Sequence, residues 1–119
     1  MILIVEDEVI SRRALRQLLR FHGYEAEVAG SAEEAIQLVA AGHLPEMALV
    51  DINLPGMNGV EFVRRLNRMA PSIPCVFMTA NDQAQEDQNR ASAARTLHKP
   101  LDVLGLLNVL HEVPGVSHA

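Results

Sequence analysis

Short apolar runs alternate along the chain with longer segments in which apolar residues recur at helical spacing. Residues 1–5 form an uninterrupted apolar run, which is typical of a central strand covered on both faces. From about 9 to 22 the apolar positions lie three and four residues apart, which predicts a helix that ends at Gly23. This alternation favours repeated strand–helix units and a parallel sheet.

A second unit follows directly. Apolar and acidic side chains alternate over residues 24–28, which predicts a half-buried peripheral strand. Ser31 and Glu34 have the spacing of a capping box, which predicts the start of a second helix that ends at Gly42. We expect this helix to bury the following apolar residues: Ala35, Ile36, Leu38 and Val39.

Three more units complete the predicted sheet. Apolar runs at 47–50 and 75–78 predict the third and fourth strands, and a short fifth strand contains Leu97. The helices predicted after these strands contain Val60, Val63 and Leu66; the polar segment 83–94; and Val103, Leu106, Leu107 and Leu110 behind the capping residue Asp102.

Length and composition predict a single α/β domain. A chain of 119 residues that is 49% hydrophobic can bury a core without a disulfide or a structural metal. Cys75 is the single cysteine and stands in an apolar run, so we expect it to be a small core residue in a reducing compartment. We assign 1–113 to the domain and 114–119 to a C-terminal tail or the start of a linker.

The charge pattern and the lack of a long apolar stretch exclude two classes of partner, nucleic acid and membranes. The net charge is −5 and the basic residues form no block, so we expect no direct nucleic-acid binding by this domain. No apolar stretch approaches the ~20 residues of a membrane span, and the N-terminus lacks the pattern of a secretion signal. We therefore expect no membrane association and a cytoplasmic location.

Charged and hydroxyl side chains stand where the predicted strands end. Glu6 and Asp7 follow the first strand, and Asp51, Thr79 and Lys99 end the third, fourth and fifth strands. Parallel strands direct their carboxyl ends to the same edge of an open sheet, where ligands bind. Three carboxylates at one place repel one another unless a cation is bound, and oxygen ligands of this kind select Mg²⁺ or Mn²⁺. The residues therefore predict a divalent-metal and phosphoryl site.

These motifs resemble the receiver domain of two-component response regulators. The resemblance rests on Glu6-Asp7, the stretch 51–59, Thr79-Ala80 and Lys99-Pro100, in this order at the ends of successive strands. It covers essentially the whole chain. It implies a flavodoxin-like, doubly wound domain with the strand order 2-1-3-4-5 and helices on both faces of the sheet.

The resemblance also implies a role for each acidic residue. Asp51 is the phosphoacceptor, which attacks a phosphohistidine of a histidine kinase or phosphotransfer domain. Asp7 and Asp51 supply side-chain oxygens to Mg²⁺, or to Mn²⁺ in its place. Glu6 acts on the metal through water, and Asn53 contributes its backbone carbonyl.

Thr79 and Lys99 bind the phosphoryl oxygens in this resemblance. Lys99 is the one lysine beside nine arginines, and a compact ammonium on a flexible stem suits a moving phosphoryl group. The family also implies a cis peptide bond between Lys99 and Pro100.

The implied function is a switch with self-catalysed phosphorylation and dephosphorylation, not a turnover enzyme. Phosphorylation changes the interactions of a partner or of an attached output domain. One alternative is a phosphorylation-independent pseudo-receiver that serves as an interaction module. The other is an aspartate-dependent phosphohydrolase, although the second acid of such enzymes, two residues after the nucleophile, is replaced here by Asn53.

Three features leave alternatives open. Thr96 stands where the family has an aromatic residue, and the segment 80–95 is short and polar, so we expect rearrangement of that segment to carry the signal. A row of arginines on the first helix predicts either a solvated face with a Glu8–Arg12 pair or a docking surface for the kinase: Arg12, Arg13, Arg16 and Arg20. The apolar residues of the last helix serve either the core alone or a homodimer.

Overall fold

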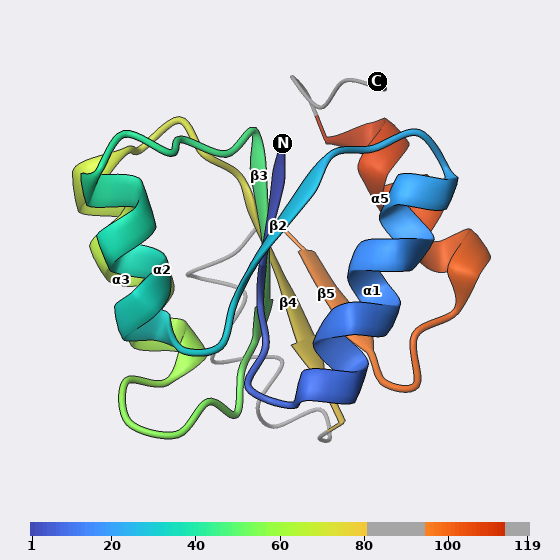
Figure 1. Cartoon of the computed structure of the whole chain (residues 1–119), viewed down its shortest axis with the longest axis horizontal. Helices are drawn as coiled ribbons and strands as arrows, with labels where there is room; N and C mark the ends of the chain where they lie inside the picture. The colour runs from blue at the N-terminus through green and yellow to red at the C-terminus, as the bar shows by residue number, and fades with distance from the viewer. Residues whose placement is uncertain (81–94, 114–119) are drawn as a thin grey trace.

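Five parallel strands form one sheet between two layers of helices (Figure 1). The computed structural model describes residues 1–80 and 95–113. The strands are β1 (Ile2–Val5), β2 (Ala26–Ala29), β3 (Met47–Asp51), β4 (Cys75–Thr79) and β5 (Arg95–His98). The helices of the described residues are α1 (Val9–Phe21), α2 (Ala32–Ala40), α3 (Gly59–Met69) and α5 (Val103–Glu112). The strand order is β2-β1-β3-β4-β5, which confirms the predicted doubly wound fold.

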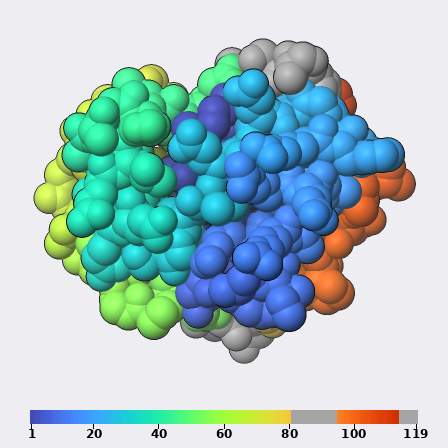
Figure 2. All heavy atoms as spheres, in the orientation of Figure 1, coloured from blue at the N-terminus to red at the C-terminus, as the bar shows by residue number. Residues whose placement is uncertain are grey.

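Each face of the sheet packs its own core. Alternate side chains of a strand point to opposite faces, so Leu3 and Val5 pack with α2 and α3 while Ile2 and Ile4 pack with α1 and α5. All residues of β1, β3 and β4 are buried, as expected of central strands. The predicted peripheral strand, β2, lies at the edge, between α1 on one side and α2 on the other (Figures 1 and 2).

Three helices start at side-chain caps. Ser31, Asn58 and Asp102 each accept a hydrogen bond from the backbone N–H three residues later. The predicted capping box at α2 is only half correct, because the Glu34 carboxylate accepts from the Gly30 N–H and not from the Ser31 N–H. This bond draws the end of the β2–α2 turn onto the first turn of α2.

The apolar pattern was less accurate on the helix surfaces. Ile36 and Leu38 are only partly buried, since the buried stripe of α2 is formed by Ala32, Ala35 and Val39. In α5, Leu106 and Leu110 are in the core, whereas Leu104 is 70% exposed. The last helix is therefore apolar on more than one face, and the homodimer stays a prediction.

Several smaller expectations were met. Cys75 is a buried core residue, and burial raises the pKa of its thiol to about 12. The Lys99–Pro100 peptide bond is cis. The predicted helix over 83–94 and the tail at 114–119 lie outside the described residues. Within 1–80 and 95–113, no helix combines the length and apolar character needed to span a bilayer.

The first turn of α3 rests directly on the backbone that carries Asp51. The Gly59 N–H donates to the Ile52 carbonyl at 3.1 Å. A Cβ atom at Gly59 would lie 2.5 Å from the Asp51 carbonyl oxygen and 2.9 Å from the Ile52 Cα. Only glycine allows this approach, so residue 59 helps to fix the end of β3.

We expect Gly59→Ala to lower the free energy of unfolding by about 1–3 kcal/mol, because the added methyl group meets backbone that cannot move aside. Urea denaturation measures the change. Gly105→Ala is the matched control, since its Cβ would meet Asp102 Oδ2 at an ordinary 3.5 Å and helix propensity favours alanine by up to ~1 kcal/mol. Equal stabilities of the two variants would contradict the close approach at Gly59.

Candidate functional site

Three carboxylates meet at the edge of the sheet where the parallel strands end. Glu6 and Asp7 follow β1, and Asp51 is the last residue of β3. One carboxylate oxygen from each of the three lies within 4.8 Å of the others. Glu6 is only 1% exposed and Asp51 is buried, whereas Asp7 is exposed to solvent.

Lys99, which follows the edge strand β5, contacts two of these acids. Its Nζ donates to Asp51 Oδ2 at 2.8 Å and to Glu6 Oε1 at 3.1 Å. The Lys99 N–H also donates to the Thr79 carbonyl at 2.7 Å, which ties the residue after β5 to the end of β4. Residues separated by up to 93 positions are thus held in one ion-pair network.

Burial and pairing divide the protons unequally between the two buried acids. Burial, together with the neighbouring Asp51, raises the pKa of Glu6 to about 7. Burial alone would also raise the pKa of Asp51, but hydrogen bonds from Glu6, Lys99 and the Asn53 N–H lower it. The carboxylates likewise raise the pKa of Lys99 against the effect of its burial. Asp51 is therefore the acid kept ionised, as a nucleophile requires.

The donor set fits a hard divalent cation. It consists of carboxylate oxygens, which suit Mg²⁺ and Mn²⁺. Burial, and then the neighbouring Asp51, raise the pKa of Glu6, and a cation bound at the cluster would favour the charged form of this acid.

The other two predicted site residues lie near this cluster, Asn53 along the chain and Thr79 through the pairing of β3 with β4. The Asn53 N–H donates to Asp51 Oδ1 at 2.9 Å, and the Asn53 side chain is exposed. Thr79 is fully buried at the end of β4, one residue beyond Met78, which lies opposite Asp51 in the sheet.

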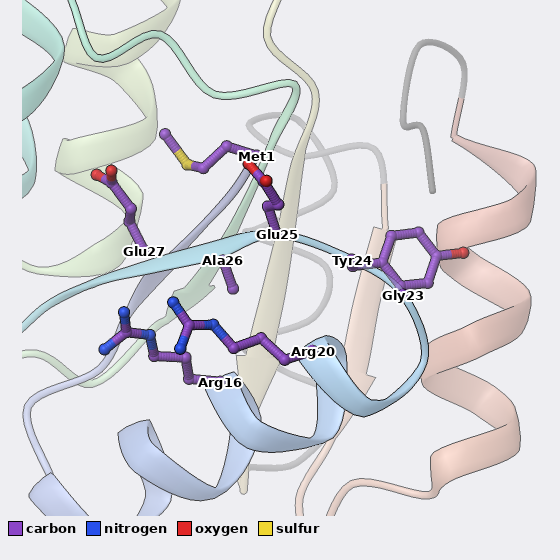
Figure 3. Close-up of a pocket in the computed structure, with 8 residues that line it drawn as sticks. All are labelled: Met1, Arg16, Arg20, Gly23, Tyr24, Glu25, Ala26 and Glu27. Carbon is purple, nitrogen blue, oxygen red and sulfur yellow. The ribbon is translucent and has the colours of Figure 1, made fainter. Parts of the chain in front are cut away.

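The arginine row of α1 does not run beside the acidic cluster as predicted. Only Arg12 approaches it, with its guanidinium 3.1 Å from the Glu6 carbonyl oxygen, and the structure places no ion pair between Glu8 and Arg12. Arg16 and Arg20 instead line a pocket of about 430 Å³ that Glu25 and Glu27 also line. In Figure 3 the two glutamate side chains extend to the side of β2 away from the arginines. Each step of four residues moves the position about 6 Å along the helix axis and about 40° around it, so Arg16 and Arg20 lie progressively further from the cluster than Arg12.

Sequence reasoning missed two contacts that shape the site. The Arg12 guanidinium also lies 3.5 Å from the Asp7 carbonyl oxygen, and the Glu33 carboxylate accepts from the Met57 N–H at 3.3 Å across to the β3–α3 loop. The spacing of polar residues along α1 was a sequence signal for the Arg12 contact. Nothing in the sequence indicated that its partners are backbone carbonyls.

Known proteins are similar to this chain in sequence and in fold. The family model described as response regulator receiver domain matches residues 2–111. The response regulator MprA of Mycolicibacterium vanbaalenii is 34% identical over 85 residues, which make up 71% of this chain and 36% of that protein. The sensor protein EvgS of Escherichia coli is 34% identical over 121 residues, covering 98% of this chain and 10% of that protein. The chain thus spans 36% of the length of the first of these curated relatives and 10% of the second.

The solved structures agree with the sequence comparison. Chemotaxis protein CheY4 of Vibrio cholerae superposes with a TM-score of 0.86 at 28% identity, over 94% of this chain and 96% of that one. A family match across nearly the whole chain, together with this fold, assigns the family. The chain belongs to the response regulator receiver domains of two-component signal transduction.

Proposed function

We propose that the chain accepts a phosphoryl group on Asp51 in a Mg²⁺-dependent reaction and thereby switches its interactions. The observation that carries this proposal is the Lys99 ammonium between Asp51 and Glu6, in the same cluster as Asp7. Its geometry supplies an ionised nucleophile, a cation and a set of metal ligands at one edge of the sheet.

The reaction exchanges one bond to phosphorus for another. An Asp51 carboxylate oxygen forms a P–O bond while the P–N bond to a phosphohistidine of the donor breaks, and the donor imidazole leaves. Asp51 Oδ1 is held by the Asn53 N–H and Oδ2 by Lys99, which fixes the plane of the nucleophile. Lys99 and Thr79 then bind the phosphoryl oxygens. A loose phosphoryl-transfer transition state needs this positioning and charge stabilisation more than covalent chemistry.

Asp7 and Asp51 would hold Mg²⁺ with their side chains, Glu6 through water and Asn53 through its carbonyl. When bound, the metal neutralises the carboxylates and the charge on the phosphoryl group. The same site would catalyse hydrolysis of the aspartyl phosphate by water, so that the chain returns to its resting state without turning over an external substrate.

The partners are a histidine kinase or phosphotransfer domain and an attached output domain or target. Curated relatives are much longer than this chain, which supports attachment to other domains. We assign 1–113 to the receiver domain itself.

A groove beside Lys99 is the surface that we expect the phosphoryl donor to use. It has a volume of about 300 Å³ and lies between α1 and the segment after β5. Its lining is mostly apolar and includes Ala14, Leu18 and Leu101, and Ile10 nearby on α1 is 77% exposed. This groove replaces the arginine row as the predicted docking site, since it is next to the phosphoryl-binding lysine.

Intact mass after incubation with acetyl phosphate and Mg²⁺ tests the phosphoacceptor. We expect a labile gain of about 80 Da in the wild type and none in Asp51→Asn. Lack of the adduct in the wild type would favour the pseudo-receiver, and rapid turnover of phosphomonoesters would favour the phosphohydrolase.

The pKa of Glu6 predicts how pH affects the chain without metal. The folded state binds an extra proton between the ordinary pKa of 4.5 and about 7, so in chelator the free energy of unfolding should fall as pH rises through this window. As the pH rises from 5 to 8, the free energy of unfolding of Glu6→Gln should increase by on the order of 2 kcal/mol relative to that of the wild type. Mg²⁺ at pH 8 should restore the stability of the wild type, because it takes the place of the proton. Parallel pH profiles of the two proteins would contradict this.

Ala14→Asp tests the groove. The added carboxylate should slow phosphoryl transfer from the donor domain at least tenfold, while labelling by acetyl phosphate stays unchanged because a small donor needs no docking. Gln17→Asp places the same charge on the exposed side of α1 outside the groove, and we expect it to transfer normally. Equal loss in both variants would argue for a general charge effect.

A further inference from the structure

Arg12 joins the loop after β1 to the turn after β2. Its Nη1 donates to the Glu6 carbonyl oxygen at 3.1 Å and lies 3.5 Å from the Asp7 carbonyl oxygen. These carbonyls belong to two residues of the acidic cluster. Both contacts come from the same nitrogen, Nη1, at the end of a side chain that is longer than that of lysine. A lysine at position 12 would therefore not place its ammonium where Nη1 lies, although it carries the same charge.

Gly30 provides the space for this guanidinium. A Cβ atom at Gly30 would lie 2.8 Å from Arg12 Nη1. The Gly30 N–H is bonded to the Glu34 carboxylate at 3.0 Å, which anchors the turn to α2. Arg12 is therefore enclosed between the β1–α1 loop and a fixed turn.

The side chain of Asp7 has no comparable anchor. It is exposed, and among residues 1–80 and 95–113 no cation pairs with it, whereas Glu6 and Asp51 share Lys99. Asp7 nevertheless lies within the 4.8 Å cluster of like charges, which repels it. Its place must be set through the backbone, and the Asp7 carbonyl is where Arg12 makes contact.

We propose that Arg12 is a positioning residue that holds the β1–α1 loop so that Asp7 and Glu6 keep the spacing required by a divalent cation. This inference rests on the proposed function, because it concerns the same metal site. Arg12 touches neither the phosphoryl group nor the cation; it acts through the two carbonyls.

The sign of the effect separates positioning from simple electrostatics. A positive charge near the cluster repels a cation, so removing the charge of Arg12 would tighten metal binding if charge were its only role. Positioning predicts weaker binding. Arg12→Lys keeps the charge and loses the planar donor group, so electrostatics predicts no change and positioning again predicts weaker binding.

The test measures Mn²⁺ affinity from the free-ion EPR signal, for the wild type and for three variants of the contact. We expect roughly tenfold weaker binding in Arg12→Lys, Arg12→Ala and Gly30→Ala, the scale seen when the partners of metal ligands are removed. Arg13→Ala is the matched control, since it removes an equal charge from an exposed neighbour on α1. Thermal unfolding of each variant verifies folding.

Two further readouts are specific to positioning. The double variant Arg12→Lys/Gly30→Ala should bind Mn²⁺ no more weakly than Arg12→Lys alone, because both changes break one contact. The ¹⁵N heteronuclear NOE of Asp7 and Glu8, measured in chelator, should fall in Arg12→Lys and stay unchanged in Arg13→Ala.

The outcomes separate this inference from the proposed function. Unchanged affinity in Arg12→Lys, or tighter binding in Arg12→Ala, would overturn the role of Arg12 while the phosphoacceptor assignment stands. A folded wild type that neither binds Mn²⁺ nor labels on Asp51 would overturn the proposed function and, with it, the role of Arg12.

Discussion

The structure depends on the ammonium of Lys99, which lies between two buried carboxylates. Glu6 and Asp51 could not both be placed inside the protein as isolated charges, because burial strongly disfavours an unpaired ion. One cation shared between them, together with a proton that Glu6 retains up to about pH 7, makes the pair tolerable. The arrangement leaves the network short of positive charge, which favours the binding of a divalent cation.

The sheet makes this contact possible and the surrounding loops refine it. Strand order places β1 beside β3, so Glu6 and Asp51 leave the sheet as neighbours, and β4 carries β5 with Lys99 to the same edge. Around this frame, Gly59 lets α3 press on the Asp51 backbone, and Glu33 ties α2 to the loop after β3. These contacts thus hold Asp51 in place, whereas Asp7 is exposed to solvent.

The predicted site residues were those at strand ends. Glu6, Asp51 and Lys99 could be placed together because the carboxyl ends of parallel strands meet at one edge whatever the details of packing. Arg12 could not be assigned in this way, because its partners are backbone carbonyls that have no sequence signature. The same limit applies to Arg16 and Arg20, which lie beside β2 because of how α1 packs in the folded protein (Figure 3).

The sequence by itself determined the class of fold, the family resemblance and the chemistry at the strand ends, since hydrophobic period and residue type are local properties. The tertiary structure alone decided which buried acid has the raised pKa, which arginine reaches the site and which side of α1 borders Lys99. Those features depend on distances of a few ångströms between residues far apart in the chain, such as the 3.1 Å from Lys99 to Glu6. Electrostatic interactions and hydrogen bonds change steeply over such distances, and only packing sets them.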